Sequence, residues 1–148
     1  MKEGGTMRWP RHFLGLPLHP MLVHFPLVFW LSVPLFDGLA LWSVAGPWWG
    51  LALGASLAGV LTGVLALMTG LMEYIHLSET GSNDVRLAAR HGVRTTLVWC
   101  AMTVKLAVAS LADTSAVLIL GCLVTDVLAC ALLLQGAFFG TKVTYGGY

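Results

Sequence analysis

The sequence has 148 residues, of which 57% are hydrophobic and only 10% are charged, with a formal net charge of +1. Soluble domains carry about 25% charged residues, so lipid is the expected solvent for this chain. It has no Lys- or Arg-rich run that could follow a phosphate backbone, which argues against a nucleic-acid partner. P-loop, GxSxG and HExxH patterns of soluble enzymes are absent, and the three cysteines fit no zinc or CxxC spacing.

The first half of the chain predicts a leader and two spanning helices. Residues 1–20 form a polar, basic leader interrupted by three prolines, which we expect at the cytoplasmic surface. Residues 21–44 and 48–72 each supply the ~20 apolar residues that a spanning helix needs. The first run is too long for a signal peptide and lacks a cleavage site after it, so it is expected to be retained. Pro47 suits the opening of the second helix.

The second half predicts two more spanning helices. A polar segment over residues 73–90 precedes helices expected at residues 91–111 and 116–139, and Ser115 is placed to cap the last one. Residues 140–148 form a short tail, rich in Gly and Tyr, that we expect at the membrane interface. The predicted fold class is therefore all-α: an integral membrane four-helix bundle over residues 21–139.

The basic residues predict the orientation. With the N-terminus inside, seven of the eight Lys and Arg residues face the cytoplasm, and only Lys105 lies within the membrane. Cytoplasmic loops of membrane proteins carry such an excess. We therefore expect both termini in the cytoplasm and a multi-pass location in a bacterial inner membrane. Most tryptophans fall near predicted helix ends, which is typical of an aromatic belt at the interface.

Small residues recur at close spacing in the second helix. Gly50 and Gly54 form one GxxxG pattern, and Gly59 and Gly63 form another. This spacing allows close approach of helix backbones in lipid. It indicates either ordinary helix packing or a flat face for a planar ligand.

Histidines gather near the predicted inner face. Residues 18–26 read LHPMLVHFP, so His19 and His24 flank the entry to the first helix, while His76 follows the second helix and His91 opens the third. Chain direction alternates, so all four are expected at a similar depth. Imidazole binds haem iron axially, and we take His24 and His91 as the ligand pair, with His19 and His76 as alternates or supporting groups. The other reading is that these histidines bond headgroups, loop carbonyls or carboxylates.

Three ionisable residues are predicted deeper in the membrane. Asp37 and Lys105 follow the two expected ligands by 13 and 14 residues, which is about 20 Å along a helix. Asp126 lies about 16 Å from the outer end of the last helix. An isolated charge in hydrocarbon costs about 2.5–3.5 kcal/mol on insertion scales, so we expect Lys105 to pair with Asp37, Asp126 or both. The cluster indicates either structural pairing or a proton or ion relay.

At LHPMLVHFP the chain resembles the bacterial membrane family called domain of unknown function 2231, which has an HPxxVHFP-type entry to its first helix. Further similarities are Asp37, the Thr69-Gly70-Leu71 segment, His91 and a glycine-rich ending over residues 136–146. One departure is Glu73, since the family tends to place an Asp after the TGL segment. The resemblance implies a four-helix membrane fold, but it assigns no activity because the function of the family is unassigned. A second, architectural likeness is to small cytochrome b bundles.

These patterns lead to one main functional hypothesis and two alternatives. The first is a membrane electron-transfer protein that binds b-type haem, catalyses no bond-making of its own, and uses Arg90 and Arg94 to pair with the haem propionates. The second is a cofactor-free subunit that stabilises a larger membrane complex. The third is a small ion or proton transporter that uses the charge cluster. Expected partners are the bilayer and either a larger redox or membrane complex or further copies of the chain.

Overall fold

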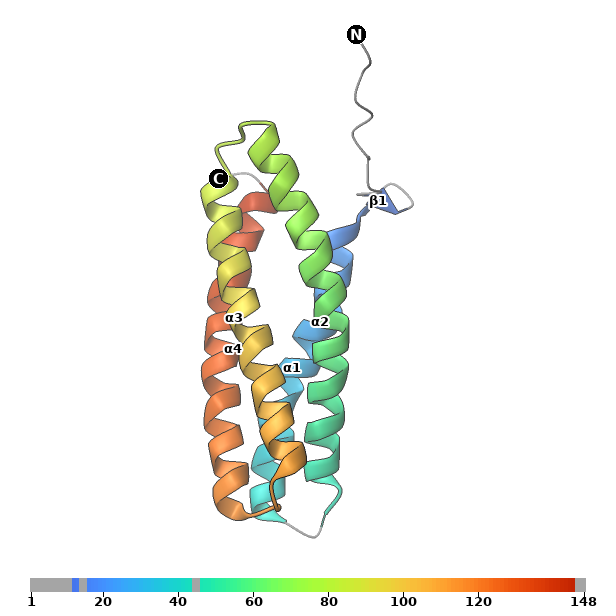
Figure 1. Cartoon of the computed structure of the whole chain (residues 1–148), viewed down its shortest axis with the longest axis vertical. Coiled ribbons are helices and arrows are strands. Elements are labelled where there is room, and N and C mark those ends of the chain that lie inside the picture. The colour runs from blue at the N-terminus through green and yellow to red at the C-terminus, as the bar shows by residue number, and fades with distance from the viewer. Residues whose placement is uncertain (1–11, 14–15, 44–45, 146–148) are drawn as a thin grey trace.

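Four long helices make up nearly all of the computed structural model, which describes residues 12–13, 16–43 and 46–145 (Figure 1). Two short strands precede them, β1 (His12–Phe13) and β2 (Leu16–Pro17), and pair antiparallel. All four helices are long and apolar enough to cross a membrane, which confirms the predicted fold class. The helices are α1 (Leu18–Trp42), α2 (Trp48–Glu79), α3 (Val85–Leu111) and α4 (Ala116–Tyr145).

The helices extend beyond the apolar runs that predicted them. α1 begins inside the expected leader, because Pro20 lies in its first turn, where a missing backbone N–H costs nothing. α2 and α3 continue through polar residues on both sides of their connecting turn, and α4 continues into the expected tail. Hydropathy marks only the part of a helix that suits lipid, whereas Glu, Lys and Arg are good helix formers outside it. The predicted end of the first helix at residue 44 and the last residues of the tail lie outside the described residues.

Local hydrogen bonds end α2 and begin α4. Gly81 has φ +66° just after α2, a conformation that residues with a Cβ adopt at a cost. The Ser82 N–H donates to Leu77 O at 3.1 Å and the Gly81 N–H to Ser78 O at 3.3 Å, which is a Schellman ending. At α4, the Leu118 N–H donates to the Ser115 hydroxyl at 3.2 Å, so the predicted cap is present.

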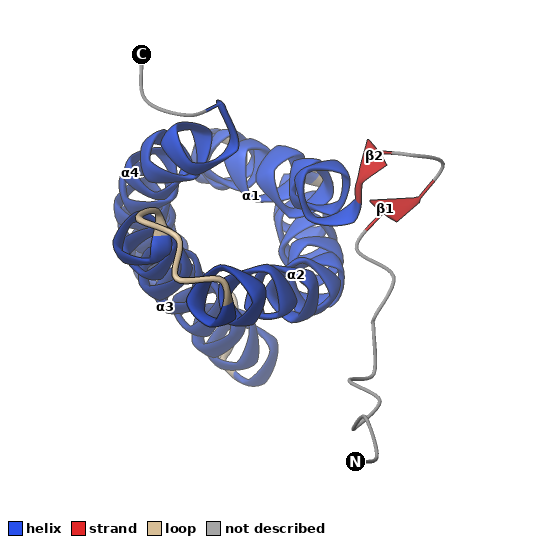
Figure 2. Ribbon diagram, turned by 90° about the horizontal axis from the view of Figure 1, so that it is seen from above, coloured by secondary structure: helices blue, strands red, loops and turns tan. Residues whose placement is uncertain are grey.

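Viewed along its axis, the bundle is a ring of four antiparallel helices in chain order (Figure 2). α1 packs against α2 and α4, and α3 packs against the same two helices. α1 and α3 therefore occupy opposite corners, and side chains that cross the interior link them. The starts of α1 and α3 share one end of the bundle with the ends of α2 and α4 (Figure 1). We call this the basic end, because it holds Arg86, Arg90, Arg94 and Lys142.

The interior is packed around tryptophan and small residues, whereas large aliphatic side chains cover the outside. The Trp30 indole contacts the position that a Cβ on Gly59 would occupy, and Trp99 and Trp30 press on Gly63. Gly50 and Gly54 have open space instead. The second GxxxG pattern is therefore a packing notch, and Trp30 is an interior residue rather than part of an aromatic belt at the interface.

A proline in α1 exposes a carbonyl that another helix satisfies. Pro34 has no N–H to bond the Trp30 carbonyl one turn earlier. The Cys130 thiol of α4 donates to this oxygen at 3.6 Å. Neighbouring helices commonly satisfy backbone groups that prolines free inside membranes.

Candidate functional site

Two imidazoles meet inside the basic end of the bundle. His19, in the first turn of α1, lies beside His91 of α3, with 6.0 Å between ring centroids and 79° between ring planes. Both side chains are half-buried. Because these helices stand at opposite corners, the two rings cross the interior to reach each other. The site therefore joins helices whose backbones are not neighbours.

Each ring is oriented through its Nδ1 atom. His91 Nδ1 lies 2.8 Å from Gly136 O, and a carbonyl can only accept, so this nitrogen carries a proton. His19 Nδ1 lies 3.2 Å from the Thr69 hydroxyl oxygen. The Thr69 hydroxyl donates to the α2 backbone at Leu65 and Ala66, so it accepts from His19. In the neutral imidazole, Nε2 of each ring is then the atom with a free lone pair.

Glycines make room for both rings. A Cβ on Gly70 of α2 would lie 2.8 Å from His19 Cε1, and a Cβ on Gly140 of α4 would lie 3.0 Å from His91 Nδ1. Both distances are shorter than a normal van der Waals contact. The rings thus fit into notches where only glycine leaves the required space. α2 and α4 supply the walls, and α1 and α3 supply the imidazoles.

The other two histidines lie elsewhere. His24 is five residues beyond His19, which turns it about 140° around α1; it is exposed, and its Nδ1 lies 2.6 Å from Pro20 O. His76 lies seven residues beyond Thr69, about 10 Å nearer the α2–α3 turn. Of the four histidines that we expected at one depth, His19 and His91 are the two whose rings meet. His24, which we had taken as the partner of His91, does not reach it. The partner is His19, which we had named as an alternate.

Two arginines lie beside this site. The Arg94 and Arg90 guanidinium carbons lie 4.7 Å and 5.9 Å from the centre of the Phe139 ring of α4. Arg94 also donates to Arg90 O at 3.0 Å. Within the described part of the chain, neither forms an ion pair with a carboxylate. Their charge is therefore available to an anionic group at the basic end.

The donor chemistry is limited to two imidazoles. Among the described residues, no group of three or more His, Cys, Asp and Glu side chains is placed to hold a metal ion. A structural zinc site uses four protein ligands and a catalytic zinc site usually three. A metal that needs only two ligands from the chain would suit the geometry better.

A charged triad occupies a second level of the interior, and the predicted pairing of Lys105 is present with both carboxylates. Lys105 Nζ of α3 donates to Asp37 Oδ2 of α1 at 3.0 Å and to Asp126 Oδ2 of α4 at 2.7 Å. Both aspartates are fully buried, and the Lys105 side chain is 2% exposed. Asp37 and Lys105 again link the opposite corners of the ring.

An apolar layer separates these two levels. Trp30, Val60, Val98 and Leu133, one from each helix, belong to the buried core cluster. Lys105 follows His91 by 14 residues on the same helix, about 21 Å. Within the described helices, no chain of hydrogen bonds links the two levels through this layer. The two levels are therefore expected to respond to substitution independently.

The sequence did not indicate that four residues belong to the histidine site: Thr69, Gly70, Gly136 and Gly140. Their part depends on which helix faces each ring, and a single sequence does not show this. The choice of His19 did have a signal. It precedes Asp37 by 18 residues, or five helical turns, so the buried stripe of α1 passes through both.

The sequence over residues 15–147 matches the family model described as "Predicted membrane protein (DUF2231)". No curated protein and no solved structure matches the chain. The match covers all four helices and both polar levels. The chain therefore belongs to the DUF2231 family of membrane proteins.

Proposed function

We propose that this is a membrane electron-transfer protein that binds a b-type haem between His19 and His91. The observation that carries the proposal is the pairing of two oriented imidazoles, 6.0 Å apart, from opposite corners of the bundle. Imidazole nitrogens bind metal ions at about 2.0–2.1 Å, so two nitrogens on one metal lie about 4 Å apart and the ring centres somewhat further. The observed separation is compatible with this arrangement.

The donor set favours haem over a bare metal ion. Haem iron needs only its axial ligands from the protein, and the site offers two imidazoles. Hydrogen bonds from Nδ1 to Thr69 and Gly136 resemble the support that metal-binding histidines usually receive. Bound haem would supply one-electron chemistry. The chain would hold both rings, exclude water with the apolar layer and place Arg90 and Arg94 near the carboxylates of the group.

The basic end is proposed to face the cytoplasm of a bacterial cell. Four basic side chains of the described residues lie at that end, and the short connection between α3 and α4 at the other end holds none. This distribution follows the positive-inside tendency of membrane proteins. The haem site would then lie just below the cytoplasmic headgroups, within reach of a redox partner on that side.

The absorption spectrum of the purified protein, reconstituted with haem, tests the proposal. We expect a Soret band and a reduced α band in the wild type, and their loss or marked shift in His19→Ala and in His91→Ala. His24→Ala is the matched control, because it removes an exposed imidazole from the same helix as His19, and its spectrum should equal that of the wild type. Circular dichroism would show that each variant retains its helices.

Two results would overturn the proposal. One is a wild-type protein that takes up no haem under conditions in which the bundle is folded. The other is a spectrum that both His19→Ala and His91→Ala leave unchanged. Absence of haem combined with co-purification in a larger assembly would favour the cofactor-free subunit instead.

A further inference from the structure

We infer that the Asp37–Lys105–Asp126 triad is a proton-binding site, in which the two carboxyl groups together hold one proton. The inference starts from a count of charges. Two ionised carboxylates and one ammonium leave a net charge of −1, and all three groups are buried. One proton on either carboxyl makes the triad neutral.

Two carboxylate oxygens without hydrogen-bond partners in the described part of the chain also indicate a proton at this site. Both carboxylates accept from Lys105 through Oδ2, and Oδ1 of each has no hydrogen-bond partner among the described residues. Buried polar atoms are seldom left unpaired. Because both carboxylates bond the same nitrogen, they lie close together. A proton on one Oδ1 can be donated toward the other carboxyl, which gives both orphan oxygens a role.

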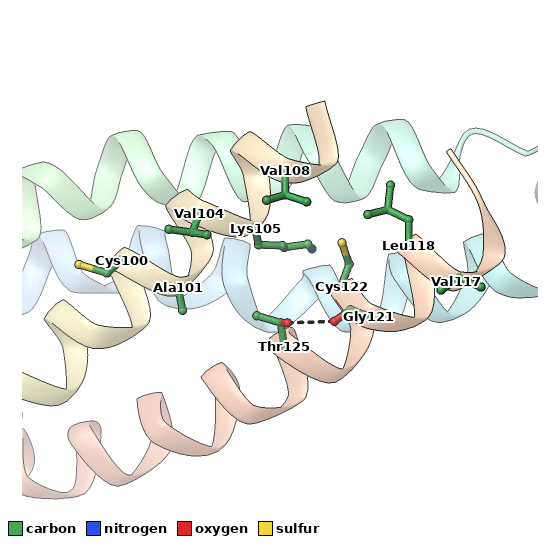
Figure 3. Close-up of a pocket in the computed structure, with 10 residues that line it drawn as sticks. All are labelled: Cys100, Ala101, Val104, Lys105, Val108, Val117, Leu118, Gly121, Cys122 and Thr125. Atoms are coloured by element: carbon green, nitrogen blue, oxygen red, sulfur yellow. Dashed lines mark hydrogen bonds between the residues drawn. The ribbon is translucent and has the colours of Figure 1, made fainter. Parts of the chain in front are cut away.

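The described residues around the triad offer no other compensating charge. The buried face of α2 contributes the Ser56 hydroxyl and no ionisable group, and α4 contributes the thiols of Cys122 and Cys130. Outside the triad, the groove between α3 and α4 is lined mainly by Val, Leu and Ala, with Thr125 bonded to its own helix at Gly121 (Figure 3). Apart from Lys105, no cationic side chain of the described helices is therefore placed to stabilise a net negative charge.

The neutral triad with a charged lysine is favoured over one with a neutral lysine. Lys105 Nζ lies 2.7 Å from Asp126 Oδ2, and charge-assisted bonds between a cationic nitrogen and a carboxylate fall at about 2.7–2.9 Å. A neutral amine would require both carboxyls to be protonated. We therefore assign one ammonium, one carboxylate and one carboxylic acid to the site.

Infrared spectroscopy of the protein in lipid vesicles counts protonated carboxyls directly through their carbonyl stretch. At neutral pH we expect one deuterium-sensitive carboxylic acid band per wild-type molecule. Asp37→Asn and Asp126→Asn should each abolish it, because a single carboxylate then balances Lys105. Lys105→Met should raise the count to two.

Asp113→Asn is the control, because it removes an exposed carboxyl from the turn after α3, and it should leave the band unchanged. A wild-type molecule with no protonated carboxyl, or with two, would overturn the inference. So would a band that survives both aspartate substitutions. The two aspartate variants test the same point separately, and the wild-type count requires no variant. None of these outcomes depends on haem, so the proposed electron-transfer function stands or falls separately.

Discussion

Replacing Lys105 by Met should destabilise the bundle by an amount that depends on pH. The substitution leaves two carboxyls buried without their common donor, and both must then be neutral. An Asp in water is half-protonated at about pH 3.9, so protonating one more at pH 7 costs about 4 kcal/mol, at about 1.36 kcal/mol per pH unit. At pH 5 the same step costs about 1.5 kcal/mol. The first figure agrees with the ~3–5 kcal/mol usually lost when one partner of a buried pair is removed.

The sign of the pH effect follows from proton counts. The folded Lys105→Met protein would bind two protons at these carboxyls and the unfolded chain almost none, so its stability falls as pH rises above about 4. The wild type would bind one, so the difference between the two proteins should grow with pH. Reversible unfolding in mixed micelles at pH 5 and pH 7 measures it.

A variant without charges provides the control for this prediction. The triple variant that combines Asp37→Asn, Lys105→Met and Asp126→Asn has no ionisable group at this level. Its free energy of unfolding should therefore lack the pH dependence expected for Lys105→Met. Replacing a buried charged cluster as a whole is often neutral or stabilising by about 1–4 kcal/mol. If Lys105→Met costs nothing, or costs the same at both pH values, the reasoning about buried charge is refuted.

Three further substitutions test the packing. Gly70→Ala should weaken haem binding by displacing the imidazole that lies against it, whereas Gly54→Ala on the same helix, with open space around it, should not; equal haem affinities would contradict the glycine notch. Gly59→Ala should cost about 1–3 kcal/mol in unfolding experiments because it overpacks against Trp30; a gain in stability would show that the indole moves freely. Cys130→Ala should lower the free energy of unfolding by about 1 kcal/mol because it leaves a carbonyl unpaired, and Cys130→Ser should lower it less because the hydroxyl can still donate. A larger loss for Cys130→Ser than for Cys130→Ala would show that the thiol is not a hydrogen-bond donor to this carbonyl.

The sequence predicted the architecture because the membrane restricts the choices. A spanning segment must satisfy its own backbone hydrogen bonds, so four apolar runs meant four helices. The triad was predictable for a related reason. A lysine in hydrocarbon is strongly destabilising unless it lies beside a carboxylate, so Lys105 was expected to pair with one. Both aspartates proved to be its partners.

The histidine site was predicted less well, because its geometry depends on rotation around helices as well as on depth. His24 and His19 are both near the inner end of α1, but they face directions about 140° apart. They differ in whether they lie on the same face of α1 as its buried residues. The spacing of 18 residues between His19 and Asp37 would have favoured His19. The glycine notches depend on neighbouring helices. The family resemblance covered Gly70 and Gly140 but did not indicate that either glycine lies against an imidazole.

Near-infrared magnetic circular dichroism of the oxidised, haem-loaded protein would show whether His19 and His91 hold the iron together, because the band position identifies the axial ligands of low-spin iron. We expect two-imidazole ligation in the wild type and in His24→Ala, and its loss in His19→Ala. Ligation by one imidazole with a different second ligand, or a high-spin iron in the wild type, would contradict the pairing of His19 with His91 around a haem.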